Sequence, residues 1–296
     1  MTLKVWIQET RPQFLVLSGV LLFLGTSVAW YEGSFHLGWA LLALVGLVFA
    51  HIAVNVLNDY FDYRSGLDLK TRRTPFSGGS GILVSGLMKP GQVLWFGVAS
   101  SLFAAVIGIY FVLERGWQLL PLLLAGALFI FLYTPFITRL GWPEWAAGVG
   151  LGSLPVLGAC FVQTASYPLQ AVIACIPSGI LVHNLLLLNE FPDVEADSQT
   201  GRKTLPIILG KRKAAFIYAA FMAILYLWVI GWVAVEVMPA FTLIALGTLP
   251  FAVKAIRGAF NHQDMNRLVP AMAQNVLVIM LFQVLLGIGY ILGGII

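Results

Sequence analysis

Most acidic side chains of this chain are gathered in two short stretches, and each stretch follows a long apolar run. The stretches cover residues 55–68 and 189–203. They hold seven of the 13 acidic residues, namely Asp59, Asp62, Asp68, Glu190, Asp193, Glu195 and Asp197. Carboxylates are costly close to a bilayer, so their concentration indicates a site. Carboxylates this close together also need a counter-charge, and a divalent cation such as Mg²⁺ binds carboxylate and phosphate oxygens.

Helical spacing places the polar side chains of each stretch on one face. In the first stretch, positions i, i+3, i+4 and i+7 are Asn55, Asn58, Asp59 and Asp62. In the second stretch, positions i, i+4 and i+8 are Asn189, Asp193 and Asp197, and Pro192 is expected to kink that helix. If the two faces oppose each other, amides and carboxylates line one cavity. The alternative is a pair of ordinary hydrated helix ends, which would not be expected to repeat Asn and Asp at fixed spacing.

The composition requires a membrane environment. Hydrophobic residues make up 59% of the chain and charged residues 10%, with a mean hydropathy of +0.91, whereas charged residues are about 25% of soluble domains. We predict an all-α polytopic membrane protein, with about nine transmembrane helices in a bundle around a central cavity. The predicted spans are 13–31, 37–58, 92–113, 117–134, 145–164, 169–190, 214–235, 238–256 and 271–294.

The basic residues predict the orientation of this bundle. If nine helices alternate across the membrane, 16 of the 17 Lys and Arg residues fall on one side and only Arg115 falls on the other. The positive-inside rule then places the N-terminus and both acidic stretches on the cytoplasmic side, and the C-terminus outside. We therefore expect an integral membrane protein whose active site faces the cytoplasm, with no cleaved signal peptide and no nucleic-acid partner.

A weak internal repeat relates the two acidic stretches. Two pentapeptides share an amide, two acids and an aromatic residue at the same positions. They are Asn58-Asp59-Tyr60-Phe61-Asp62 and Asn189-Glu190-Phe191-Pro192-Asp193, and they begin 131 positions apart. Each pentapeptide follows an even-numbered predicted helix. We therefore expect one domain over residues 1–296, with two similar halves at roughly 13–134 and 145–256 and a ninth helix after them.

The two motifs together resemble those of a known family. The chain resembles the UbiA superfamily of intramembrane aromatic prenyltransferases in its two Asp-rich motifs. These are Asn58-x-x-x-Asp62-x-x-x-x-x-Asp68 and Asp193-x-x-x-Asp197-x-x-x-Gly201. The resemblance covers nearly the whole chain, because the predicted spans and the positions of both motifs agree with it. The six-residue step from Asp62 to Asp68 and the run 74–81 are more similar to the 1,4-dihydroxy-2-naphthoate (menaquinone-type) branch than to the 4-hydroxybenzoate branch.

The resemblance implies Mg²⁺-dependent transfer of a polyprenyl group from its diphosphate to an aromatic small molecule in the membrane. The implied ligands of Mg²⁺ are Asn58, Asp62, Asp68, Asp193 and Asp197, supported by Asn55, Asp59 and Asn189. Binding of the diphosphate is implied for Asn58, Arg72, Arg73, Arg202 and Lys203, of which Lys203 is the favoured cation. Positive-inside bias alone remains an alternative explanation of these basic residues.

The remaining implied roles concern catalysis and the acceptor. Asp62 and Asp193 are expected to be essential, and Tyr133 could stabilise an allylic cation or deprotonate the acceptor. An interfacial anchor is the alternative for Tyr133. Arg139 could bind an acceptor carboxylate or be a surface charge. In the naphthoate branch, prenylation accompanies loss of that carboxylate.

Other functions remain open at this point. Within the same family, the acceptor could instead be 4-hydroxybenzoate or another quinone or lipid precursor. A CDP-alcohol phosphotransferase would carry its Asp motif in one continuous segment, which this chain lacks. A cation-coupled transporter would place its acids near the middle of the bilayer, whereas these acids lie at helix ends. The oligomeric state is not predicted.

Overall fold

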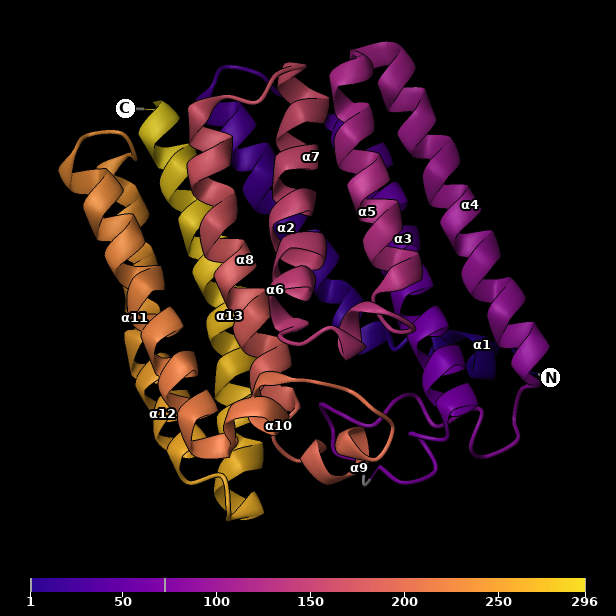
Figure 1. Cartoon of the computed structure of the whole chain (residues 1–296). Helices are drawn as coiled ribbons and strands as arrows, with labels where there is room; N and C mark the ends of the chain where they lie inside the picture. The colour runs from indigo at the N-terminus through magenta and orange to yellow at the C-terminus, as the bar shows by residue number, and fades with distance from the viewer. Residues whose placement is uncertain (1, 72, 296) are drawn as a thin grey trace.

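The computed structural model describes residues 2–71 and 73–295 as helices joined by turns and two longer loops (Figure 1). In this described part, eight helices are long and apolar enough to cross a membrane, and Trp117–Leu132 is a shorter apolar helix. In chain order the nine segments are α2 (Pro12–Tyr31), α3 (Leu37–Ser65), α4 (Pro90–Arg115), η1 (Trp117–Leu119) with α5 (Leu120–Leu132), α6 (Glu144–Ala147) with η3 (Gly148–Ser153) and α7 (Leu154–Thr164), α8 (Leu169–Asn189), α11 (Lys211–Ala234), η4 (Ala240–Thr248) with α12 (Leu249–Phe260), and α13 (Met265–Ile295). The predicted all-α membrane bundle is confirmed.

The polar ends of α3 and α8 differ in shape. α3 stays helical through the whole first motif face and ends at Gly66, whose φ of 78° is left-handed. α8 ends at Asn189, and Pro192 lies in the turn before the short helix α9 (Val194–Ser198). Proline has no N–H for the helical ladder. Pro192 therefore separates two helices, and does not merely bend one.

Both acidic stretches lie at the same end of the bundle, which we call the acidic end (Figure 1). There the loop 66–89 follows α3, and α9 and α10 (Leu205–Leu209) follow α8. The short helix α1 (Leu3–Glu9) lies beside this end, whereas the C-terminal end of α13 is at the opposite end. The topology therefore brings together two sequence segments that are far apart in the chain.

Close contacts and buried hydrogen bonds hold the central helices together. A Cβ atom at Gly25 of α2 would lie 2.5 Å from the carbonyl oxygen of Val156 in α7, so only glycine allows this approach. The buried Asn184 of α8 donates to the carbonyl oxygen of Tyr218 in α11 at 3.0 Å, and the Tyr218 hydroxyl donates to Asn275 of α13 at 2.9 Å. Such contacts are needed because lipid provides no hydrophobic force between helices.

Candidate active site

The last turns of α3 present the first acidic face. Asp59 and Asp62 are buried there, and Asn55 donates to the carbonyl oxygen of Thr10 at 2.9 Å. This bond ties α3 to the joint between α1 and α2. Asn58 lies on the same face and donates to the hydroxyl of Thr134, which follows α5, at 3.0 Å. The amide oxygen of Asn58 is therefore free to face the cavity that this residue lines.

The second acidic face begins at the end of α8. The side-chain oxygen of Asn189 is buried without a hydrogen-bond partner among the described residues. Asp193 and Asp197 follow on one helical turn, with the Asp197 N–H donating to the Asp193 carbonyl oxygen at 2.8 Å. Asp193 also accepts from the Ser77 hydroxyl at 3.5 Å. The turn at Pro192 thus returns both carboxylates toward loop 66–89.

Arg202 joins the two faces. Its guanidinium forms an ion pair with Asp62 of the first face and lies 3.4 Å from Asp197 of the second. Its side chain is 17% exposed, and it lines the same cavity as both carboxylates. The two acidic stretches therefore meet in space, with a positive charge between them.

Loop 66–89 covers this meeting point and depends on glycine. Gly79 has a left-handed φ of 71°, and a Cβ there would lie 3.1 Å from Asp68 and 3.3 Å from Asp59, measured to carboxylate oxygens. A Cβ at Gly81 would collide with the guanidinium of Arg73. Glycine at these positions lets the backbone pass directly over the carboxylates.

A buried carboxylate from α1 also belongs to this region, although it is not part of either acidic stretch. Glu9 is fully buried and accepts from the Ser80 hydroxyl at 2.8 Å, while the Ser80 N–H donates to Asp59 at 2.9 Å. Burial, with the nearby charge of Asp59 adding to it, raises the pKa of Glu9 to about 8. Burial at this position therefore favours the protonated form of Glu9.

Backbone hydrogen bonds fix the segment that carries Arg202. The Lys203 N–H donates to the Thr138 carbonyl oxygen at 2.8 Å, and the Trp142 N–H donates to the Lys203 carbonyl oxygen at 3.1 Å. The Leu205 N–H donates to the buried carboxylate of Glu144 at 2.7 Å. This pairing leaves the Lys203 side chain exposed and outside the cavity lining.

Arg73 and Arg139 have surroundings that differ from those of Arg202. Arg73 is exposed and packs against Gly81, and Arg72 lies outside the described residues. Arg139 is exposed and lines a second, more polar cavity of about 360 Å³, which also borders Asp62 and Arg202. The geometry thus brings Arg202, and not Lys203, to the acidic faces, and it leaves Arg139 at a neighbouring opening.

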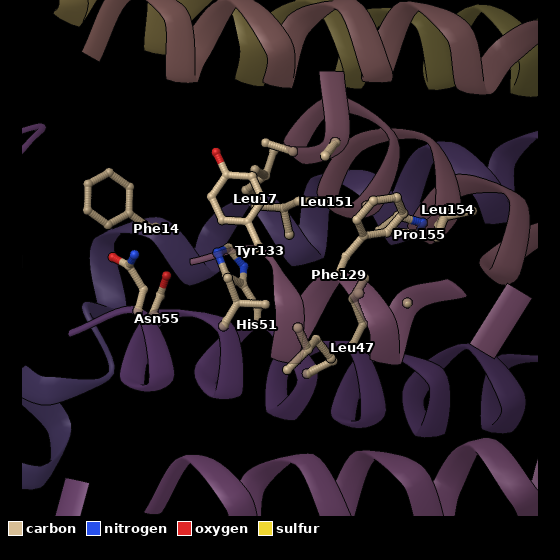
Figure 2. A pocket seen from close by; sticks show the side chains of 18 of the residues that line it. Phe14, Leu17, Leu47, His51, Asn55, Phe129, Tyr133, Leu151, Leu154 and Pro155 are labelled. Atoms are coloured by element: carbon tan, nitrogen blue, oxygen red, sulfur yellow. The ribbon is translucent and has the colours of Figure 1, made fainter. Parts of the chain in front are cut away.

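The main cavity has a volume of about 770 Å³ and extends from the acidic end into the bundle. At its polar end lie Asn58, Asp62, Asp68, Asp193, Asp197 and Arg202. Along α3 the lining runs from Asp62 to Ala43, which is about 28 Å at 1.5 Å per residue. Figure 2 shows Phe129 and Tyr133 turned into this space, with His51 and Leu47 of α3 on another wall.

The wall away from the acidic end is apolar and partly open. Leu102 of α4 and Leu124 of α5 line the cavity, yet they are 62% and 57% exposed. The cavity therefore also reaches the lipid-facing surface between α4 and α5. A molecule with a charged head and a long apolar tail matches this combination of a polar end, an apolar wall and a side opening.

The carboxyl groups at the polar end have raised pKa values. Burial, followed by the charge of neighbouring carboxylates, raises the pKa of Asp68 to about 8 and that of Asp193 to about 7. Burial also raises the pKa of Asp197 to about 6, although Arg202 opposes this shift. A cation that binds here would favour the deprotonated forms, because it stabilises their negative charge.

The donor set fits a hard divalent cation. It consists of carboxylate and amide oxygens, which are the ligands that Mg²⁺ prefers. Among the described residues, no three His, Cys, Asp or Glu side chains are close enough to share one ion in this arrangement. The guanidinium of Arg202 lies between Asp62 and Asp197 and supplies the positive charge. Binding of a cation between these residues would therefore require Arg202 to move aside.

Fold and site together define an intramembrane protein whose cavity is charged at one end and apolar along its wall. The chain belongs to the UbiA prenyltransferase family, which it matches over residues 18–289. It is 32% identical to a 1,4-dihydroxy-2-naphthoate octaprenyltransferase of Bacillus subtilis over 96% of this chain and 91% of that protein. The protein is therefore a prenyltransferase, which excludes the phosphotransferase and transporter alternatives.

Solved structures show the same fold. A UbiA homologue from Aeropyrum pernix superposes with a TM-score of 0.71 at 18% identity, covering 90% of this chain and 95% of that one. A UbiA homologue from Archaeoglobus fulgidus, bound to DMAPP and Mg²⁺, superposes with a TM-score of 0.64 at 14% identity, covering 95% and 98%. At these identities, the likeness establishes the shared architecture of the bundle.

Proposed function

We propose that this protein transfers a polyprenyl group from its diphosphate to 1,4-dihydroxy-2-naphthoate, in a Mg²⁺-dependent reaction at the cytoplasmic side of the membrane. The observation that carries the proposal is one continuous cavity with five carboxylates and the guanidinium of Arg202 at one end and a long apolar wall beyond them. The name of the Bacillus subtilis relative supports the acceptor, and the A. fulgidus structure with DMAPP and Mg²⁺ supports the donor and the metal.

The polar end would hold the diphosphate together with the metal. A carboxylate and a phosphate oxygen about 4 Å apart repel by roughly 4 kcal/mol at an effective dielectric constant of 20. The residues that would hold Mg²⁺ are Asn58, Asp62, Asp68, Asp193 and Asp197. Bound Mg²⁺ would neutralise the diphosphate and stabilise the charge that grows on it as it leaves. Arg202 would turn from its carboxylates to donate to the diphosphate oxygens.

The aromatic side chains beside the polar end would stabilise the allylic cation that remains. Figure 2 places the rings of Phe129 and Tyr133 in the cavity, and both come from the end of α5. The negative face of an aromatic ring attracts a cation without adding to it as a nucleophile. The apolar wall would exclude water, so that the carbon of the acceptor ring, rather than water, captures the cation.

The acceptor would approach through the smaller polar cavity. This cavity borders Asp62 and Arg202, and its lining includes Arg64 and Arg139. A guanidinium can bind a carboxylate through two parallel hydrogen bonds, so Arg139 would orient the acceptor acid. Loss of that carboxylate during prenylation is part of the proposal. Another aromatic acid, such as 4-hydroxybenzoate, is the second candidate acceptor, because the same contacts would hold its carboxylate.

The proposed orientation follows from charge. Arg115 lies at the end of α4 away from the acidic end, where it donates to the carbonyl oxygen of Val162 at 2.8 Å. The other 16 basic residues belong to predicted segments on the acidic side. The positive-inside rule therefore supports an acidic end in the cytoplasm, where a soluble aromatic acid would reach it.

Product analysis tests this proposal directly. The purified protein in lipid nanodiscs would be incubated with Mg²⁺, a prenyl diphosphate and a panel of aromatic acids, and the products identified by mass spectrometry. We expect a prenylated naphthoquinol that lacks the carboxylate. Asp62→Asn and Asp193→Asn should each lower turnover at least 1000-fold, while Asp264→Asn, which alters an exposed acid outside both cavity linings, should not. Near-normal turnover in both site variants would refute the assignment.

A further inference from the structure

Two glycines on the apolar wall of the cavity leave room for a larger side chain. A Cβ atom at Gly126 of α5 would meet no heavy atom within 4 Å, and one at Gly158 of α7 would meet only Leu122, at 3.4 Å. Other glycines of the wall are covered by side chains. A Cβ at Gly150 would lie 2.9 Å from Phe129, for example. The space beside Gly126 and Gly158 is therefore part of the cavity itself.

These two glycines lie on helices that face each other. Leu122 is one helical turn before Gly126, so both point from the same face of α5. Since Leu122 is the side chain nearest to Gly158, this face of α5 is turned toward α7. Gly126 and Gly158 thus border one passage between α5 and α7.

The glycines mark two different depths in this passage. Gly126 is seven residues from Tyr133 at the polar end of α5, which is about 10 Å at 1.5 Å per residue. Gly158 lies beside Leu122, which is 11 residues from Tyr133, so its depth is about 16 Å from the same polar end. The lining continues past both glycines to Leu119 and Val162.

We propose that Gly126 and Gly158 are specificity-determining residues that keep this passage open for the prenyl tail and so set the length of tail the enzyme accepts. The inference rests on the proposed function. An extended isoprene unit contains four chain bonds of about 1.5 Å and advances roughly 5 Å. Gly126 therefore lies beside the end of the second unit and Gly158 just beyond the third, in a passage whose lining continues past both.

The competing path for the tail is the side opening between α4 and α5. Leu102 and Leu124 mark this opening. Because lipid is as apolar as the cavity wall, burial energy does not choose between the two paths. The shape of the cavity therefore determines which path the tail takes. The room beside Gly126 and Gly158 gives the tail a path through the bundle.

The test is a competition among donors of different length. Protein in nanodiscs would receive Mg²⁺, the acceptor and equal amounts of the diphosphates with two, three and eight isoprene units, and the products would be counted by mass spectrometry. Gly126→Phe should retain use of the two-unit donor within about threefold and lose at least tenfold with three and eight units. Gly158→Phe should retain both shorter donors and lose at least tenfold with eight units.

A control variant and a second readout complete the experiment. Gly231→Phe alters an exposed glycine of α11 that also has open space at its Cβ but does not line the cavity, so its length profile should equal that of the wild type. If both cavity variants keep the wild-type profile, or lose all donors equally, the inference is overturned. Thermal stabilisation by each diphosphate should show the same cut-offs without turnover. Absence of any product from the wild-type protein would instead count against the proposed function alone.

Discussion

Replacement of Arg202 by Gln should weaken binding of the prenyl diphosphate much more than it weakens the fold. The guanidinium reaches Asp62 and Asp197, and both carboxylates can be neutralised by protons or by Mg²⁺ when it is lost. A hydrogen bond to a charged group contributes about 1.5 to 3 kcal/mol. Loss of one such bond to the diphosphate should raise KM roughly 10- to 150-fold at about 1.4 kcal/mol per factor of ten.

Steady-state kinetics at saturating Mg²⁺ and acceptor would measure this effect. Lys203→Gln is the matched control, because it removes an adjacent positive charge whose side chain is exposed and outside the cavity lining. We expect its KM to change by no more than about threefold, as for an exposed charge. Arg202→Lys should recover only part of the loss, since one ammonium cannot replace two guanidinium nitrogens. A larger effect of Lys203→Gln than of Arg202→Gln would show that the assignment of the diphosphate contact is wrong.

Two further predictions concern the metal site. The raised pKa values of Asp68, Asp193 and Asp197 (about 8, 7 and 6) mean that these groups gain protons as the pH falls through this range, and protonated carboxyls bind Mg²⁺ poorly. The Mg²⁺ concentration for half-maximal turnover should therefore increase from pH 8 to pH 6, and a constant value would contradict this. Gly79→Ala should raise the same concentration at least tenfold, since its methyl group would press on two carboxylates. Gly86→Ala, which has a similar φ of 68° but open space around it, should cost only about 1 kcal/mol of stability.

The sequence was sufficient to predict the bundle and the meeting of its acidic faces. The nine spans follow from hydropathy, because few lengths of apolar helix fit a bilayer. The side on which Asp62 and Asp193 lie follows from counting spans, since each motif comes after an even-numbered helix. The single domain and the internal repeat remain predictions.

Other features depend on the conformation of loops, which cannot be predicted from a repeating pattern of residues. Arg202 and Lys203 are neighbours in a loop, so sequence spacing could not tell which side chain points inward. Backbone pairing of Lys203 with Thr138 settles that choice in the structure. Glu9 lies far from both motifs in the sequence, and only the fold of loop 66–89 brings Ser80 to it. An acid next to the first apolar run was the one available signal.

The contact between Glu9 and Ser80 links α1 to loop 66–89. α1 carries exposed Leu3 and Ile7 and precedes the first membrane-spanning helix, so its tilt should respond to the state of the lipid surface. Through Ser80, any such tilt would pull on the backbone that passes over Asp59. The two turns of α1 are thus linked through Ser80 to the backbone that covers the first acidic face, so a change at Glu9 would be transmitted to Asp59.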